Sequence, residues 1–287
     1  MLLQFIINGL ITGLLYSLLA IGFALVYNTT HIFHIAAAGI YVFAAYMFWL
    51  ASGIMPIWLA FIFAAILSAG LSYLIDVVIY LPLKRKKASL NIALVSSIGV
   101  MTVIVNVLAL IFGNESKSLS TYSSTVYDLR VFSLSQPQLV QVVVAVICLS
   151  AFFVFFSKNS VGIKLRAISE DEQMFSSLGY SSRTMRAFAF ILSGIFIAIA
   201  SGLNAIEVGM DVNMGMNVLI TAIVAMIIGG IGRIEACLIG GLSLGILQSL
   251  VLIHFSTNWQ SAITFIVLLL FLFFRPQGLA GYKQRTV

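Results

Sequence analysis

Charged side chains are scarce in this sequence of 287 residues. Lysine, arginine, aspartate and glutamate together make up 8% of it, against about 25% in soluble domains. None occurs before Asp76, so roughly the first quarter of the chain has no ionic group to hold it in water. Because 61% of the residues are hydrophobic, the chain cannot cover a water-facing surface. The composition excludes a soluble domain and indicates a polytopic membrane protein.

Cysteine and catalytic motifs are equally sparse. Cys148 and Cys237 lie in apolar stretches, which is typical of small packed side chains and gives neither a disulfide framework nor metal-ligand spacing. The sequence has no GxxxxGK[ST] phosphate loop, no HExxH and no CxxC pair. We therefore predict a transport protein that is not an enzyme, with no metal and no cofactor bound by this chain.

Long hydrophobic runs fill most of the chain. A spanning helix needs about 20 apolar residues, and polar, glycine and proline positions divide the sequence into nine such candidates. We predict a single all-α membrane domain over residues 1–287, a bundle of about nine spanning helices. The first run lacks the basic start of a signal peptide, so we interpret it as a retained helix. The nine runs are residues 4–27, 31–50, 56–80, 90–112, 138–157, 186–208, 216–230, 236–255 and 259–274.

The basic residues predict the orientation, because cytoplasmic loops are enriched in lysine and arginine. Nine crossings put 13 of the 15 basic residues on one side and leave Lys117 and Arg130 opposite, in a loop over residues 113–137. This predicts an outside N-terminus, a cytoplasmic C-terminus and an extracytoplasmic 113–137 loop. The short 216–230 run is also compatible with a re-entrant half-helix, which would break the asymmetry. The same asymmetry accounts for the net charge of +6, so we expect no nucleic acid partner.

One long polar island interrupts the apolar chain, and we interpret residues 158–185 as a cytoplasmic docking loop. Ser169 and Glu172 have the spacing of a capping box, which predicts a helix from about Glu170 to Leu178 that Gly179 closes. So short a helix is marginal alone and needs something to pack against. It could lie on the membrane surface or fit a groove on a partner protein. Its predicted common face consists of Asp171, Met174, Phe175 and Leu178.

Two apolar segments share a small-xxx-small spacing that allows close helix packing. The first contains Gly9 and Gly13, the second Gly241 and Gly245, and we expect both helices to be buried. The ten-residue stretches GLITGLLYSL and GLSLGILQSL agree at six positions. An inverted repeat and chance similarity between apolar helices both explain this match.

Isolated polar residues within or beside the runs are candidates for a solute route or for structural roles. An acid at membrane depth is costly, and Asp76 lies near enough to the basic end of its run to form an ion pair there. His31 and His34 are predicted to share a helical face, as interfacial histidines more than as metal ligands. Uncharged amides that could bond across helices or line a route are Asn106, Asn204 and Asn217.

Taken in order, several motifs resemble the LivH type of ABC importer permease, the branched-chain amino acid transport family. GIKLRAISEDEQMFSSLGY, residues 162–180, is similar to that family's docking loop. IIGGIGRIEACLIGGLSLGILQSL, residues 227–250, resembles its glycine-rich stretch, and LPLKRKKASLNIAL from Leu81 resembles its segment before the fourth helix. The chain then ends on the family's RP-x-GL-x-G pattern, from Arg275.

The resemblance implies a permease subunit in a bacterial inner membrane. Its implied partners are two cytoplasmic ATPases that bind ATP, a second permease, either a copy or LivM-like, and an extracytoplasmic solute-binding protein, with lipid around the bundle. The helix from Glu170 to Leu178 would be the coupling helix. Met174, Phe175 and Leu178 would be its buried anchors, and Arg166 and Glu170 its charged flanks.

The chain departs from this family where the second helix begins. The family usually has a motif like NFAHGE there, whereas this sequence continues from His34 through Ile35 and three alanines to Gly39. The apolar replacements favour an apolar or small neutral solute. Branched-chain or other amino acids are the leading expectation, and urea, amides or another small solute are the alternative. From another class, an ion-coupled carrier working alone would use Asp76 as its coupling group.

Overall fold

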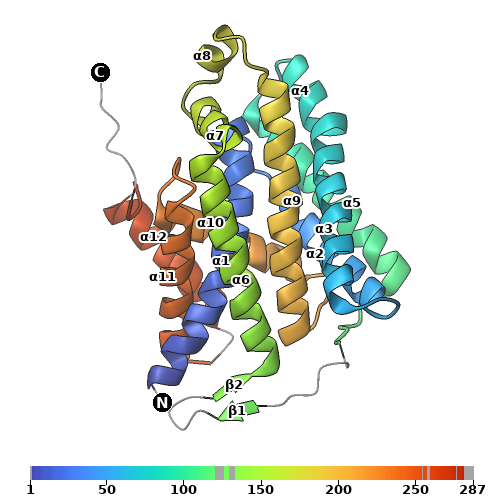
Figure 1. The fold of residues 1–287 in the computed structure, drawn as a ribbon, viewed down its shortest axis with the longest axis vertical. Coiled ribbons are helices and arrows are strands. Elements are labelled where there is room, and N and C mark those ends of the chain that lie inside the picture. Colours follow the sequence, from blue (N-terminus) through green and yellow to red (C-terminus); the bar gives the residue numbers. More distant parts are fainter. Residues whose placement is uncertain are drawn as a thin grey trace.

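The chain folds into an elongated helical bundle in the computed structural model, which describes residues 2–119, 126–128, 133–253, 255–256, 259–275 and 277–280 (Figure 1). One short antiparallel hairpin, β1 (Val126–Asp128) with β2 (Ser133–Ser135), lies at one end. The helices are α1 (Leu2–Thr30), α2 (Ala36–Ser52), α3 (Ile57–Ile75), the π-helix η1 (Asp76–Tyr80), α4 (Leu81–Arg85), α5 (Leu90–Phe112), α6 (Gln136–Lys158), α7 (Ser160–Glu170), α8 (Glu172–Ser177), α9 (Ser182–Glu207), α10 (Met214–Gly229), α11 (Ala236–Val251) and α12 (Gln260–Phe274).

Each of the nine predicted apolar runs forms a helix. In the part of the chain that the structure describes, five helical stretches are long and apolar enough to cross a membrane, namely α1, α3 through α4, α5, α6 and α9. The other four, α2, α10, α11 and α12, are apolar helices of 15 to 17 residues. Because lipid cannot satisfy backbone hydrogen bonds, apolar runs of this length fold as helices. The protein is therefore a polytopic membrane helix bundle, as predicted.

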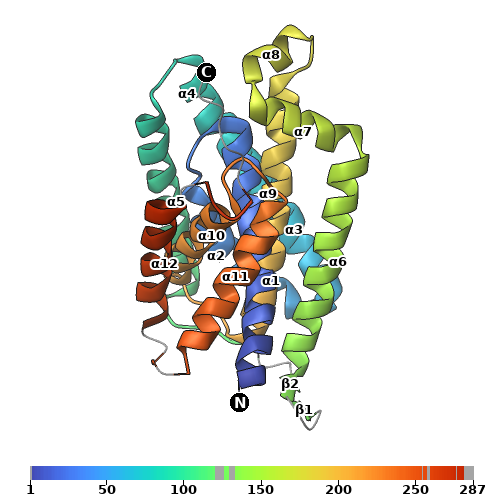
Figure 2. The same cartoon turned by 90° about the vertical axis from the view of Figure 1, so that its left-hand side faces the viewer.

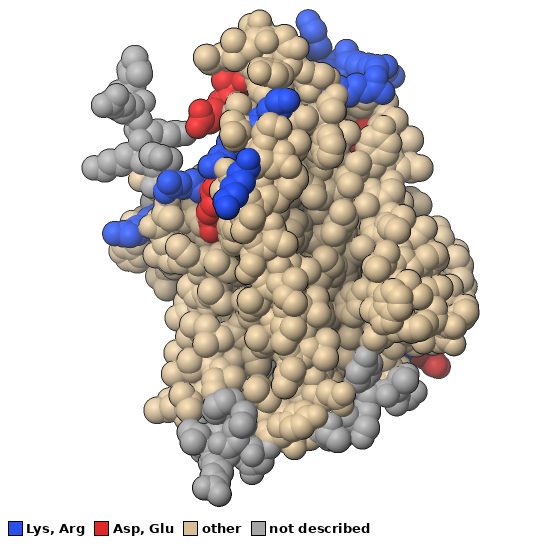
Figure 3. All heavy atoms as spheres, in the orientation of Figure 1, with Lys and Arg blue, Asp and Glu red and all other residues tan. Residues whose placement is uncertain are grey.

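The two ends of the bundle differ in charge. Figures 1 and 2 place α4, α7 and α8 at one end and the N-terminal end of α1 with the β-hairpin at the other. Lysines and arginines gather at the α4, α7 and α8 end, above a belt without charge (Figure 3). We call this the basic end and the opposite one the hairpin end. At the hairpin end Gln4 exchanges two hydrogen bonds with the Ser133 backbone, at 2.8 and 2.9 Å.

The segment before α10 enters the bundle without helical structure. At the hairpin end the backbones of Met210 and Lys117 exchange two hydrogen bonds of 2.8 Å. Met210 and Val212 are buried, and Gly215, in the first turn of α10, packs against the Ala38 carbonyl near the start of α2. Helix α10 therefore begins inside the bundle. Irregular backbone at membrane depth is tolerated where protein covers it, which explains why the 216–230 run is so short.

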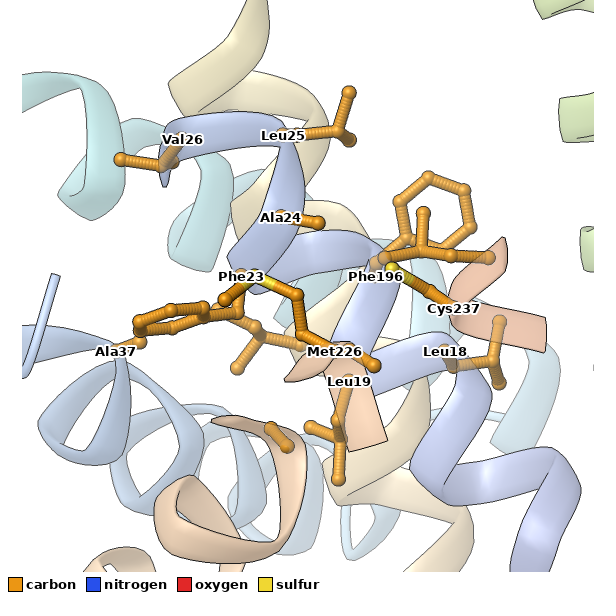
Figure 4. Close-up of a cluster of buried hydrophobic side chains, with 14 of the residues drawn as sticks. Leu18, Leu19, Phe23, Ala24, Leu25, Val26, Ala37, Phe196, Met226 and Cys237 are labelled. Atoms are coloured by element: carbon orange, nitrogen blue, oxygen red, sulfur yellow. The ribbon is translucent and has the colours of Figure 1, made fainter. Parts of the chain in front are cut away.

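The core is built around α1, which packs against α11, α9 and α10. Figure 4 shows Leu18, Leu19, Phe23, Phe196 and Met226 within one cluster of buried side chains. By contrast, α5 and α12, which lie along one flank in Figure 2, bury little surface. Their apolar outer faces suit contact with lipid or another membrane subunit.

Candidate coupling surface and membrane cavity

The structure has a helix where one was predicted between Glu170 and Leu178, but the limits of this helix differ from the prediction. Two helices, α7 and α8, meet at an extended Asp171, whose carboxylate accepts hydrogen bonds from the Gln173 and Met174 amides at 2.8 and 2.9 Å. The prediction that Ser169 caps the helix was wrong. Ser169 lies within α7, where its hydroxyl bonds the Arg166 carbonyl. The acid next to the turn is the better cap because its oxygen reaches two free amides at once.

The side chains of α8 divide between the two sides of the helix. Met174 and Leu178 are 63% and 66% exposed, whereas Phe175 is 3% exposed. The Phe175 ring stacks on the Tyr180 ring, with 5.2 Å between the ring centroids. Phe175 therefore anchors the loop to its own chain and is not free to enter a partner. Gly179 follows with a positive φ of 83°, as expected for a residue that ends a helix.

Ion pairs tie this loop to the rest of the basic end. The Lys84 ammonium, at the end of α4, contacts the Glu172 carboxylate in the first turn of α8. Arg166 of α7 lies 3.6 Å from Glu235 and donates a 2.7 Å hydrogen bond to the Phe156 carbonyl at the end of α6. Glu170, the predicted second charged flank, is the exposed last residue of α7.

A buried ion pair lies just beneath this loop. Arg186, in the first two turns of α9, donates from Nε to the Asp76 carboxylate at 2.7 Å, and both side chains are 4% exposed. Asp76 is the first residue of the π-helix η1, which connects α3 to α4. The expectation that Asp76 forms a structural ion pair is confirmed. Its partner comes from 110 residues away, so the sequence did not reveal which basic residue it would be.

His34 belongs to a structural network. Its Nδ1 lies 2.9 Å from the Tyr80 hydroxyl, which donates to Ser97, and Ser97 accepts from the Ala36 amide. His31 and His34 lie in the connection between α1 and α2, and His31 has a positive φ of 54°. The prediction that they share a helical face was therefore wrong, and His34 does not reach the cavity described below.

The two glycine pairs bring α1 and α11 together as antiparallel neighbours. A Cβ added at Gly9 would lie 2.8 Å from Ile246, and one at Gly13 would lie 2.9 Å from Leu242. Added at Gly245 or Gly241, it would overlap the backbone or side chain of α1. The prediction that both helices are buried is confirmed. Only glycine allows backbones to approach this closely.

The sequence of residues 241–245 also matches the GxSxG pattern of hydrolases. This stretch lies inside α11, and Ser243 donates to the Gly240 carbonyl at 3.0 Å. A nucleophile serine instead needs a sharp turn from strand to helix that exposes its hydroxyl. The pattern is therefore part of helix packing and not an enzyme site.

A polar cavity of about 230 Å³ lies between α1, α2, α9, α10, α11 and α12. It brings together two of the predicted route residues, Asn204 and Asn217, although α9 and α10 supply them separately. Asn106 lies outside it, exposed on α5, with its amide bonded to the Thr102 carbonyl. The lining residues are Thr12, Leu15, Tyr16, Leu19, Tyr41, Asn204, Asn217, Val218, Ile220, Thr221, Gln248, Gln260, Ser261, Thr264 and Phe265.

A hydrogen-bond network that sequence reasoning missed forms one wall of the cavity. Gln248 accepts from the Tyr16 hydroxyl at 2.8 Å and from Gln260 at 3.1 Å, and donates to Thr264 at 2.5 Å. Gln248 is 3% exposed. Glutamine within or beside an apolar run was the available signal, because such amides need partners inside the membrane.

Comparisons with known proteins agree on one relationship. A family model described as "Branched-chain amino acid transport system / permease component" matches residues 5–272. The chain is 29% identical to the high-affinity branched-chain amino acid transport system permease protein BraD of Pseudomonas aeruginosa, covering 98% of this chain and 96% of that protein. Identity to LivH of Escherichia coli K12 is also 29%, with the same coverage.

More distant matches extend this picture. A tyrosine transport system permease protein of Clostridioides difficile is 25% identical over 78% of this chain and 72% of its own length. The solved structure of PsaBC from Streptococcus pneumoniae in complex with a Fab has a TM-score of 0.53 and 13% identity, covering 94% of this chain and 91% of the other. At that identity the match supports a common fold alone.

Proposed function

This chain belongs to the permease-component family of branched-chain amino acid transport systems, and we propose that it forms part of the membrane route for branched-chain or other amino acids in an ABC importer. As a permease of that type it lies in the inner membrane and is not the ATPase subunit. Its proposed partners are two cytoplasmic ATPases, a second permease, either a copy or LivM-like, and an extracytoplasmic solute-binding protein.

The observation that carries this proposal is the exposed apolar pair formed by Met174 in α8 and Leu178 directly after it. Met174 and Leu178 project from the basic end, and Lys84, Glu172, Arg166 and Glu235 form ion pairs around the loop. Large apolar side chains exposed on a polar surface mark a protein interaction site. ATP-driven movement must reach the permease through its cytoplasmic face, so we assign α8 as the contact with the ATPase.

The proposed topology follows from the charge distribution. The basic end is cytoplasmic by the positive-inside rule, which puts the hairpin end and the N-terminal end of α1 outside. The nine apolar segments then cross in alternation, the seventh as α10 together with the 208–213 segment, of which Met210 and Val212 are buried. The C-terminal residue lies beyond the described residues, but Leu279 bonds the Ile228 carbonyl near the end of α10, which favours a cytoplasmic C-terminus.

An ion-coupled carrier is the less supported alternative. Its candidate coupling group, Asp76, is engaged with Arg186 and is 3% exposed, so it is not free to exchange an ion with solvent. Import of urea, amides or another small solute by the same permease type is the alternative to amino acid import. Competition for the cognate solute-binding protein would separate these solutes from amino acids.

The test replaces the exposed pair on α8. We expect Met174→Asp with Leu178→Asp to reduce ATP-dependent uptake at least about ten-fold, because losing two buried apolar contacts at an interface costs more than about 1.4 kcal/mol. Uptake and ATP hydrolysis are measured in vesicles holding the complete importer. Gln173→Asp with Ser177→Asp is the matched control, because it puts the same charge on neighbouring exposed positions of α8.

Wild-type uptake by the Met174 and Leu178 variant would contradict the assignment of α8. Phe175→Asp would be a poorer test, although the resemblance implies that Phe175 is an anchor of the coupling helix. Since Phe175 is buried against its own chain, that change would damage the loop as well as any contact with a partner. Uptake by this chain under an ion gradient, with the ATPases absent, would overturn the importer proposal itself.

A further inference from the structure

The cavity between α1, α2, α9, α10, α11 and α12 combines three properties of a small-molecule site. Its volume of about 230 Å³ is room for one small solute. Its wall is fixed by the Tyr16, Gln248, Gln260 and Thr264 network. Apolar residues complete it, so the cavity offers both hydrogen bonds and apolar contact.

Among the residues that the structure describes, none that lines this cavity is charged. An ion at membrane depth is costly unless a partner compensates for it. A solute with a net charge would therefore find no counter-ion here. Neutral amides instead offer a carbonyl that accepts and an NH₂ group that donates, so they complement both the ammonium and the carboxylate of a zwitterion without favouring a net charge.

Two amide groups of the cavity lining, on α9 and α10, lie outside the Gln248 network. The Asn217 amide, exposed on the first turn of α10, makes no side-chain hydrogen bond within the described part of the chain. The Asn204 amide, on α9, interacts with the Tyr41 hydroxyl. Gln248, by contrast, is already hydrogen-bonded to Tyr16, Gln260 and Thr264. Asn204 and Asn217 are therefore the amides that can turn to bind a solute.

Apolar side chains close the cavity toward the basic end. A second space of about 10 Å³ adjoins it and shares Leu19, Tyr41 and Val218. That space, too small for more than about one water, is bounded by Phe23 and Leu219. Figure 4 shows Leu19, Phe23 and Ala37 among the packed side chains of this region. The polar cavity therefore ends at an apolar floor.

We propose that this cavity is an intramembrane binding site for one small solute without net charge. Its hydrogen-bonding end meets Asn204 and Asn217, and its aliphatic end packs on Val218, Ile220 and Phe265. An aliphatic amino acid zwitterion and an aliphatic amide share this chemistry. The assignment rests on the proposed importer function and adds to it a site, a solute class and the residues that select it.

The first experiment uses leucine and isobutyramide as probes of the complete importer in vesicles. Asn204→Leu with Asn217→Leu keeps the side-chain size and removes two neutral hydrogen-bonding groups, so leucine uptake is expected to fall about five-fold or more. Asn106→Leu is the matched control, because its amide lies on the outer face of α5. ATP hydrolysis without solute should stay unchanged in the Asn106→Leu control. Lysine and glutamate should compete far less than either neutral probe.

The second experiment does not depend on transport. In a background with Cys148 and Cys237 replaced by serine and alanine, Asn217→Cys should react with a small neutral thiol reagent, and saturating leucine or isobutyramide should slow that reaction at least three-fold. Protection by one probe alone tells which of the two solutes the site takes. The same reagent on Asn106→Cys should be insensitive to either solute.

The possible failures are distinguishable. Wild-type importer that takes up neither probe in the presence of ATP overturns the proposed solutes and leaves α8 coupling to be judged from hydrolysis. If the wild type is active and the Asn204 and Asn217 variant takes up leucine equally well, the cavity is not the site. The cavity is also not the site if neither probe protects Asn217→Cys from the thiol reagent. Equal competition by lysine overturns the selection against net charge.

Discussion

At the scale of single residues, Asp76 and Arg186 form the contact whose loss should destabilise the protein most. Both side chains are almost fully buried and 2.7 Å apart. Such a pair stabilises little compared with apolar packing, but each charge without its partner is strongly destabilising. The pair joins the end of α3 to the start of α9, directly below the docking loop. It therefore holds α8 in a defined position relative to the bundle.

Asp76→Asn should destabilise the protein by about 3–5 kcal/mol, because it leaves the Arg186 cation buried without a counter-ion. Thermal unfolding in detergent measures the effect. Replacing both partners, as Asp76→Leu with Arg186→Met, should restore much of the loss, since the buried charge is then gone. A double variant no more stable than Asp76→Asn would contradict this reasoning. Glu115→Gln, an exposed acid at the hairpin end, is the control.

At the scale of elements, the crossing of α1 and α11 follows from two matching segments. Gly9 meets Gly245 and Gly13 meets Gly241, while Tyr16 bonds Gln248 at 2.8 Å. Tyr16 and Gln248 occupy the same place in the two similar ten-residue stretches. The contact is thus nearly symmetric, with the segments running in opposite directions. Glycine at the crossing also positions the Gln248 network against the cavity.

Gly241→Leu should separate α1 from α11, because an added side chain there would overlap Ser17. Overpacking of this kind costs about 1–3 kcal/mol or more. Thermal unfolding would report the loss, and uptake should fall with it because the wall of the cavity moves. Gly70→Leu is the control, since an added Cβ at Gly70 meets nothing within 4 Å. Equal stability of the two variants would argue against close packing at the crossing.

At the scale of the whole molecule, the charge difference between the two ends implies a fixed orientation. Figure 3 shows lysine and arginine gathered around one end, and the docking loop lies there too. If this end faces the cytoplasm, α8 and the ATPases are on the same side. The opposite end, with the β1–β2 hairpin, then receives solute from outside. The orientation thus connects the position of the coupling loop to the direction of import.

Single cysteines test the orientation in a background without Cys148 and Cys237. Gln173→Cys, exposed on α8, should react with a membrane-impermeant thiol reagent only after the membrane is opened. Asn114→Cys, exposed just after α5, should react in intact cells. Labelling in the reverse pattern would overturn the proposed topology. Val224→Cys, buried in α10, should stay unlabelled in both conditions.

Some features could be predicted because they depend on local composition. Apolar runs determined where the helices lie, since backbone groups in lipid must bond within their own segment. Two glycine pairs indicated close packing, and a polar island indicated the loop that contains α7 and α8. Its helix limits were predicted wrongly, because serine and aspartate both suit a cap, and only the turn at Asp171 shows that Asp171 and not Ser169 caps α8. Phe175 was misjudged for a similar reason, because spacing alone does not tell which face of α8 its own chain covers.

The sequence by itself determined the class of the protein, the order of its helices and the asymmetry of its charge, because solvation acts on each segment separately. The tertiary structure alone decided that Arg186 neutralises Asp76, that His34 joins Tyr80 and Ser97, and that Asn204 and Asn217 face one cavity while Asn106 does not. These contacts join residues far apart in the chain. Their partners depend on how whole helices pack, which local composition does not encode.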